Sequence, residues 1–245
     1  MRRILSVELR KMFDTRSGFW LMTSIGVTAV LATAAVTVFA PDEALDYETF
    51  ASAIGFPIAV ILPMIAILSV TSEWSQRTGL TTFTLVPRRG RVIAAKAVCA
   101  VGIGVASMLV AAAVGAVGNV VDTAIAGVET TWNVSWEEFG LIVLANVLGL
   151  LIGLMLGVVT RSSAGAIVAC FVYSLPLPTV SSALASTQEW WRDNGPWLDF
   201  NYASSGLFTG HMTSEQWAQM CTSGLVWLVL PLAVGLHLVL RSEVK

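Results

Sequence analysis

Charged side chains are scarce in this sequence. Only 12 % of its 245 residues are charged, 56 % are hydrophobic, and the mean hydropathy is +0.76. A soluble domain carries about 25 % charged residues, and a chain with so few cannot cover its apolar surface in water. The scarcity of charge therefore excludes an ordinary soluble domain and predicts a polytopic membrane protein. The formal net charge of −2 also excludes the basic footprint of a nucleic-acid-binding protein.

Catalytic and metal-binding motifs are absent as well. Cys99, Cys170 and Cys221 lie far apart, in or beside apolar runs, and form no CxxC pair. We interpret them as small hydrophobic residues, because an odd and scattered set supports neither a disulfide framework nor a metal site. The chain contains no G-x-x-x-x-G-K-[ST] phosphate loop, no H-E-x-x-H and no G-x-S-x-G. We therefore expect no enzyme activity, no cofactor and no metal in this chain.

Six apolar runs are long enough to cross a bilayer. Each has about 20 residues or more, and a helix of that length covers the ~30 Å hydrocarbon layer. The spans must be helices, because lipid offers the backbone no hydrogen-bond partner. The predicted spans are residues 18–40, 50–71, 92–121, 139–160, 164–184 and 220–240. We expect Pro57 and Pro63 in the second span, and Pro176 and Pro178 in the fifth, to kink or interrupt their helices.

Two segments outside these spans have their own character within the single all-α domain expected for residues 1–245. Residues 1–17 combine apolar and cationic side chains, which is typical of an amphipathic helix at the inner headgroup layer; a disordered basic start is the alternative. Residues 185–219 hold seven aromatic rings, and such rings prefer the membrane interface. For this second segment we favour short outer-face helices or a re-entrant dip, with a small folded outer cap as the alternative.

The basic residues predict the orientation. With the N-terminus inside, 13 of the 14 Lys and Arg residues lie on the inner side, and only Arg192 lies outside. The sequence thus predicts six spans with both termini cytoplasmic. Lys96 lies one turn inside the third span, so we expect its side chain to snorkel to the surface. No charge lies near the middle of a span, which argues against ion-coupled transport and favours a hydrophobic or amphipathic cargo.

The segment between the second and third spans, residues 72–91, combines a helix start, apolar anchors and a basic cluster. Ser72 can cap a helix, Glu73 suits its first turn, and Pro87 ends it. Apolar anchors are provided by Trp74, Leu80, Phe83 and Val86, and the basic cluster consists of Arg88, Arg89 and Arg91. The residues alone fit two interpretations: an element that docks a soluble partner, or a solvated loop that obeys the positive-inside rule.

The sequence E-W-S-Q-R-T-G-L-T-T-F-T-L-V-P-R-R-G-R-V-I-A-A-K resembles the loop between the second and third spans of type-2 ABC exporter permeases, most closely those of actinobacteria. That family has a Glu, a Gly/Thr pair, an apolar segment, a Pro-x-Arg and a Lys that opens the third span. The matching positions here are Glu73, Thr78 with Gly79, residues 80–86, Pro87 with Arg89, and Lys96. The basic start, the six spans and the aromatic segment before the last span follow the same layout.

The resemblance implies that the loop is a coupling helix that docks into a groove on a separate ATPase. Glu73 and Arg77 would be its ionic contacts, and Trp74 and Phe83 its packing anchors. Two ATPase subunits would bind ATP and Mg and would drive a dimer of permeases, most simply a homodimer, in the bacterial cytoplasmic membrane. The expected function is export of a drug, a lipid or a lipophilic peptide from the cytoplasm or the inner leaflet.

Two other functions are weighed against export. A membrane scaffold or assembly factor would need no ATPase partner, and a neighbouring gene with a phosphate loop would favour the exporter over it. An intramembrane enzyme is disfavoured because no catalytic constellation is present.

Small residues on the fourth span predict close helix packing. Gly149, Gly153 and Gly157 form a double GxxxG stripe, with Asn146 one turn earlier. Glycines at this spacing let two helix backbones approach each other. We favour packing within the subunit, with a dimer seam as the alternative.

Overall fold

The computed structural model describes residues 2–75 and 89–241, and within these residues every regular element is a helix. The elements are α1 (Arg2–Asp14), α2 (Arg16–Phe39), η1 (Asp42–Ala44), α3 (Tyr47–Ser75), α5 (Arg89–Ala126), α6 (Trp136–Thr160), α7 (Ser163–Ser174), α8 (Pro176–Thr187), α9 (Glu189–Leu198), α10 (Phe200–Ser205), η2 (Gly206–Phe208), α11 (Ser214–Gly224), η3 (Leu225–Val229) and α12 (Leu230–Arg241). Within these described residues, six helical stretches are long and apolar enough to cross a membrane. The prediction of an all-α polytopic membrane protein is confirmed.

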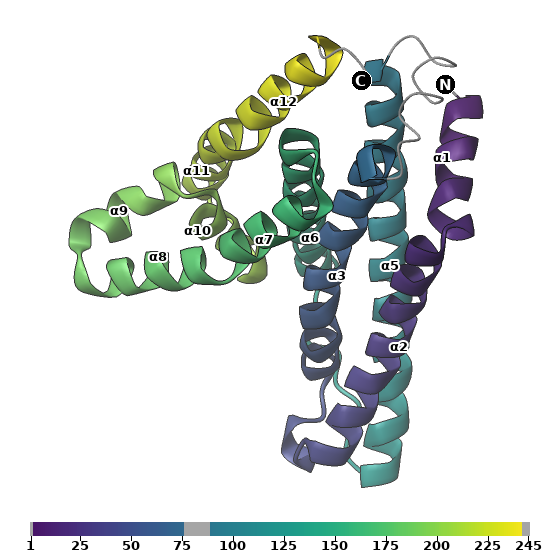
Figure 1. Cartoon of the computed structure of the whole chain (residues 1–245). Helices are drawn as coiled ribbons and strands as arrows, with labels where there is room; N and C mark the ends of the chain where they lie inside the picture. The colour runs from purple at the N-terminus through teal and green to yellow at the C-terminus, as the bar shows by residue number, and fades with distance from the viewer. Residues whose placement is uncertain (1, 76–88, 242–245) are drawn as a thin grey trace.

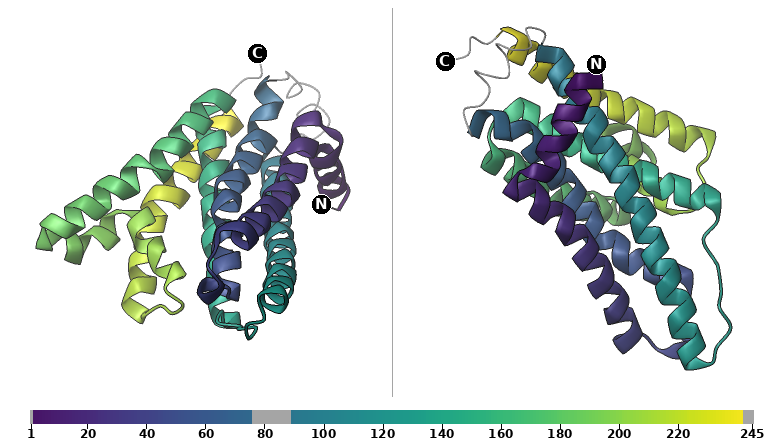
Figure 2. Two further views of the ribbon diagram at one scale, coloured as in Figure 1. Left: turned by 90° about the horizontal axis from the view of Figure 1, so that it is seen from below. Right: turned by 90° about the vertical axis from the view of Figure 1, so that its right-hand side faces the viewer.

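The long helices α2, α3, α5 and α6 form a bundle with α3 at its centre (Figures 1 and 2). Helix α3 packs against α2, α5, α6 and α7, and its Ile58 and Leu62 are fully buried together with Leu150 and Leu154 of α6. Many large apolar side chains point outward instead, such as Phe56 and Ile125. That distribution suits a lipid solvent, in which an outward apolar side chain is not penalised.

The prolines act differently in the second and fifth spans. Helix α3 runs without interruption through Pro57 and Pro63, so of the two predicted effects, a kink or an interruption, the interruption does not occur there. In the fifth span α7 ends at Ser174, Leu175 caps it, and α8 starts at Pro176, as predicted for this pair of prolines. Proline suits the first position of a new helix because its missing N–H has no intrahelical partner there.

Short helices fill the aromatic segment before the last span, as predicted. Helices α8 and α9 lie side by side in an arm that projects from the bundle (Figures 1 and 2). The indole of Trp191 joins them by donating to Ser181 Oγ over 3.1 Å. Helix α10 and η2 fold back toward α6 and bury Phe200 and Leu207 in a second core. The last span then runs from α11 through a π-helical turn, η3, into α12.

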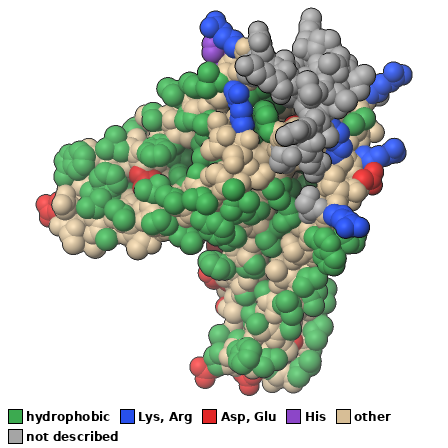
Figure 3. Space-filling view, in the orientation of Figure 1, with side chains coloured by type: hydrophobic (Ala, Val, Ile, Leu, Met, Phe, Trp, Pro, Cys, Tyr) green, Lys and Arg blue, Asp and Glu red, His purple; other side chains and the backbone are tan. Residues whose placement is uncertain are grey.

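The two ends of the bundle carry opposite charge. On the face shown in Figure 3, Lys and Arg side chains gather at the end where both chain termini lie, and Asp and Glu lie mainly at the opposite end and at the tip of the α8–α9 arm. Helix α5 extends beyond the predicted limit of residue 121 at the acidic end. Its last turns bury Asp122 and Thr123, and Thr37 of α2 donates a hydrogen bond to the Asp122 carboxylate.

Helix α1 packs against α5 and α2 with one side only. That side carries Leu5, Glu8 and Met12, spaced as neighbours on a helix face. Val7 and Phe13, two apolar residues that the amphipathic pattern also contains, are exposed. Helix α1 therefore has a packed face with a buried carboxylate at its centre, and a separate exposed apolar face.

Candidate functional site

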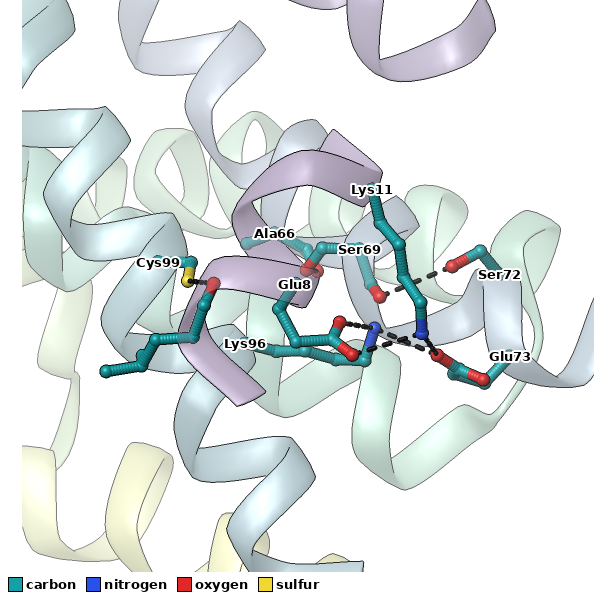
Figure 4. A network of polar contacts seen from close by, with 9 residues as sticks. Glu8, Lys11, Ala66, Ser69, Ser72, Glu73, Lys96 and Cys99 are labelled. Atoms are coloured by element: carbon teal, nitrogen blue, oxygen red, sulfur yellow. Dashed lines mark hydrogen bonds and ion pairs between the residues drawn. The ribbon is translucent and has the colours of Figure 1, made fainter. Parts of the chain in front are cut away.

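Three segments that are distant in sequence meet at the basic end of the bundle. They are the middle of α1, the last turn of α3 and the second turn of α5, and of these α3 and α5 flank residues 76–88 in the chain. Each contributes at least one charged side chain: Glu8 and Lys11 from α1, Glu73 from α3 and Lys96 from α5 (Figure 4). We call these four residues the ion-pair ring.

The charges in the ring alternate in sign. Lys96 Nζ lies 2.6 Å from Glu8 Oε2 and 3.1 Å from Glu73 Oε1. Lys11 Nζ lies 3.1 Å from Glu8 Oε1 and 3.1 Å from Glu73 Oε1. Each ammonium therefore contacts both carboxylates, and each carboxylate contacts both ammonium groups. Two negative and two positive charges balance, so the ring as a whole carries no net charge.

Because three of the four charged side chains are buried, each needs close partners of opposite charge. The side chains of Glu8, Glu73 and Lys96 are only 4–5 % exposed, whereas that of Lys11 is 40 % exposed and reaches the surface. Buried ions lose several kcal/mol of hydration each, and only close partners of opposite charge offset that loss. Moving any one of the three segments away would leave a buried charge unpaired. The ring thus joins α1, α3 and α5 into one unit at the edges of residues 76–88.

The pKa of Lys11 reflects both its burial and its partners. Partial burial favours the neutral amine and by itself lowers the pKa. The hydrogen bond to Glu8 and the charge of Glu73 outweigh that effect, so the pKa of Lys11 is raised above its ordinary value. Lys11 therefore stays charged at physiological pH and keeps the ring neutral overall.

Further contacts seat α1 beside the ring. The thiol of Cys99 on α5 donates to the carbonyl of Leu5 over 3.6 Å (Figure 4). Met12 is buried in the main core, and Trp74, the neighbour of Glu73, packs against that core while half-buried. Apolar packing and ion pairing therefore act on the same face of α1.

The expected coupling residues divide into two groups. Glu73 and Trp74 lie in the last turn of α3, and Arg89 starts α5. Arg77, Thr78, Gly79, Phe83 and Pro87, together with the Arg89 side chain, lie outside what the structure describes. The predicted role of these residues in docking an ATPase stays a prediction. For Glu73 the structure adds that its carboxylate is buried and engaged by two lysines of its own chain.

The expected behaviour of Lys96 is wrong. Its ammonium does not snorkel to the surface, because Glu8 and Glu73 hold it in a buried position. The contribution of Glu8 and Lys11 was not predicted at all. Glu8 did leave a signal in the sequence, since it is an acidic residue three positions after Leu5 and four before Met12. A carboxylate on the apolar stripe of a helix needs a buried cationic partner.

The glycines of the stripe on α6 lie in two different environments. A Cβ on Gly153 would lie 2.6 Å from the Pro63 carbonyl oxygen, and one on Gly157 would lie 3.4 Å from the Ile67 carbonyl oxygen. These two glycines let α6 pack against the backbone of α3 within the same chain. A Cβ on Gly149 would meet nothing within 4 Å. Asn146, one turn earlier, lies beside that open space and is buried.

The ring offers ion pairing between lysines and carboxylates. Among the residues that the structure describes, no group of three or more His, Cys, Asp or Glu side chains could hold a metal ion. Alternating lysines and carboxylates can hold helices together and transmit a displacement from one helix to the next.

Comparison with known proteins agrees with this architecture. A search of curated proteins gave no match. A family model described as "ABC-2 family transporter protein" matches residues 4–177, which is more than half of the chain and includes the whole ion-pair ring. Members of that family are membrane subunits of ATP-binding-cassette transporters and work with an ATPase partner. A basic helix, a helical bundle and the resemblance around Glu73 and Lys96 thus lead to the same assignment, and the chain belongs to the ABC-2 family of transporter proteins.

Proposed function

We propose that this permease is the membrane subunit of an ATP-driven exporter, and that residues 72–91 form its contact with the ATPase. Two copies of the chain pair with two ATPase subunits, which bind ATP and Mg. The complex lies in the bacterial cytoplasmic membrane with both termini of the permease on the cytoplasmic side. It moves a hydrophobic or amphipathic molecule, such as a drug, a lipid or a lipophilic peptide, outward.

The ion-pair ring is the observation that carries this proposal. Glu73 lies in the last turn of α3, three positions before residue 76, and Lys96 lies near the start of α5, after residue 88. Both residues contact Glu8 or Lys11 of α1 through short ion pairs. A displacement of residues 76–88 by a partner would therefore be passed to α1, α3 and α5 together. Rigid transfer of this kind is what a motor outside the membrane needs in order to move spans within it.

The distribution of buried charge supports a lipophilic cargo. The buried charged residues of the described spans, Glu73, Lys96 and Asp122, lie toward the ends of α3 and α5. Transporters driven by ion gradients use ionisable groups deep within their spans. A transport path without such groups is better suited to an apolar molecule, whose movement is driven by ATP hydrolysis in a partner subunit.

A negative charge introduced into the docking segment is expected to separate the permease from its ATPase. We expect Arg77→Glu and Phe83→Asp each to abolish co-purification of the ATPase subunit and the ATP turnover that the permease stimulates in proteoliposomes. Each change places an unpaired negative charge where the proposal requires ionic or apolar contact. The matched control is Arg192→Glu on α9, an exposed position far from this segment. If both variants retain the ATPase as the control does, the docking assignment is refuted.

Cysteine labelling tests the orientation. In a Cys221→Ser background, which removes the exposed native cysteine, we expect Thr81→Cys to resist a membrane-impermeant maleimide in intact cells. Glu129→Cys, at an exposed position between α5 and α6, should react under the same conditions because the proposal places it outside. Labelling of Thr81→Cys in intact cells would overturn both the topology and the docking of the ATPase.

A further inference from the structure

Asn146 carries a buried hydrogen-bond acceptor that no described residue of its own chain uses. The residue is 5 % exposed and lies about 15 Å along α6 from Trp136, well inside the span. Its Nδ2 donates to the carbonyl of Ile142 over 2.9 Å. That bond fixes the orientation of the amide, since the flipped amide would set two oxygens against each other. Among the described residues, no donor reaches Asn146 Oδ1.

Two cavities lie beside Asn146. The first, of about 450 Å³, lies between α3, α6, α7 and α10, and the second, of about 330 Å³, lies between α3, α5 and α6. Asn146 lines both of them, as do Phe56 and Phe208. These volumes fall in the range of sites that hold small molecules. The neighbouring helices thus leave room beside Asn146, which is one of two described residues, with Asn119, whose buried amide oxygen lacks a donor.

The first cavity is kept open by a glycine. Gly149 lines it one turn after Asn146, and a Cβ at this position would meet nothing within 4 Å. Gly153 and Gly157 continue the same stripe, but the backbone of α3 occupies the space beside them. The absence of a side chain at Gly149 is therefore not required for helix packing. It leaves space beside the Asn146 amide that a ligand can occupy.

The lining defines the chemistry of the ligand. Phe56, Phe171, Phe200 and Phe208 surround the first cavity with aromatic rings, and its other walls are mostly aliphatic. The Asn146 oxygen can only accept a hydrogen bond, and hydrocarbon lipid tails have nothing to donate. A ligand that satisfies this site has an apolar body and one hydrogen-bond donor, such as a hydroxyl or an amine. Glu138, which lines the second cavity, favours the same kind of donor.

We propose that Asn146 and the two cavities beside it form a binding site, within one subunit, for an amphipathic small molecule that donates a hydrogen bond to Asn146 Oδ1. Binding follows from the described residues alone, whereas the role of this ligand as the exported cargo rests on the proposed function. The site lies between α3 and α6, so a motion of α3 relative to α6 would change its shape. The acceptor gives selectivity for a donor, and the aromatic walls give affinity for the apolar body.

A matched pair of probes tests the site. 1-Pyrenemethanol and 1-methylpyrene share the apolar body, and only the first carries a hydroxyl donor. Energy transfer from the tryptophans to pyrene measures binding to the full-length chain in lipid nanodiscs, with empty nanodiscs as the background. We expect pyrenemethanol to bind about tenfold more tightly than methylpyrene, as one net hydrogen bond predicts. Equal affinity of the two probes would overturn the proposal.

Two variants complete the test. Asn146→Leu should weaken binding of pyrenemethanol about tenfold and leave that of methylpyrene unchanged, because it removes the acceptor alone. Gly149→Leu should fill the first cavity and weaken binding of both probes at least tenfold. Gly140→Leu is the control on the same helix, since a Cβ there also meets nothing within 4 Å and Gly140 lines neither cavity. Wild-type binding by Gly149→Leu would refute the site. Because no ATPase is present, failure here is distinct from failure of the docking experiment.

Discussion

Replacing Lys96 by Met is expected to destabilise the permease by about 3–5 kcal/mol, the usual effect of removing one partner from a buried ion pair. Lys96 is the buried cation of the ion-pair ring and contacts both carboxylates. Without it, Glu8 and Glu73 would face each other inside the protein with only the half-exposed Lys11 between them. Thermal unfolding in detergent, followed by the loss of the monodisperse species, measures the effect.

Two further variants make the Lys96 result specific. Arg91→Met removes an exposed cation from the same end of α5 and is expected to leave the unfolding temperature nearly unchanged. The double variant Glu8→Leu, Lys96→Met leaves the Lys11–Glu73 pair balanced and should be more stable than Lys96→Met alone. Equal loss in the single and double variants would contradict the pairing of Glu8 with Lys96.

Adding one methyl group at Gly153 is expected to separate α6 from α3. The Cβ of Gly153→Ala would lie 2.6 Å from the Pro63 carbonyl oxygen and 2.9 Å from its Cα, both backbone atoms that no rotamer change can move. Overpacking of this kind typically costs about 1–3 kcal/mol. The loss should appear as a lower unfolding temperature, and also as a change in the first cavity, which is lined by Pro63.

The control for Gly153 lies one turn earlier on the same helix. Gly149→Ala adds the same methyl group where nothing lies within 4 Å, so we expect no loss of stability, and a small gain where helix propensity dominates. The two substitutions are chemically identical and differ only in what α3 places opposite them. If both lower the unfolding temperature equally, the close approach of α3 and α6 at Pro63 is incorrect.

Much of the fold could be predicted because the solvent is lipid. A segment that crosses hydrocarbon must be an apolar helix of sufficient length, so the six spans follow from hydropathy alone. The break at Pro176 was predicted for a local reason as well, since proline lacks an N–H. The prolines of α3 left open whether the helix would kink or break, and the structure shows one continuous helix packed among α2, α5, α6 and α7.

The ends of the spans were harder to predict than their existence. Helix α5 continues to Ala126, beyond the predicted end at residue 121. Asp122 reads as a loop residue in the sequence, but in the structure it is buried and accepts a hydrogen bond from Thr37 of α2. A polar residue is a span boundary only when no neighbouring helix satisfies it, and hydropathy does not contain that information.

For the candidate site too, the sequence predicts the region but not the contacts. The motif from Glu73 to Lys96 marks the right region of the chain. It does not reveal that Lys96 turns inward, because its partner Glu8 lies 88 positions away. The three glycines of α6 also look equivalent at their regular spacing. Only the position of α3 makes Gly153 and Gly157 packing residues and leaves Gly149 beside a cavity.

The sequence by itself determined the membrane class, the helical spans and the separation of basic from acidic ends, since each depends on local composition and on the lipid solvent. Tertiary structure alone decided which charges are buried as a neutral ring and which acceptor is left beside a cavity. Both depend on atoms supplied by helices that are distant in the chain. The free energy of a buried polar group is set by its partners rather than by its neighbours in sequence.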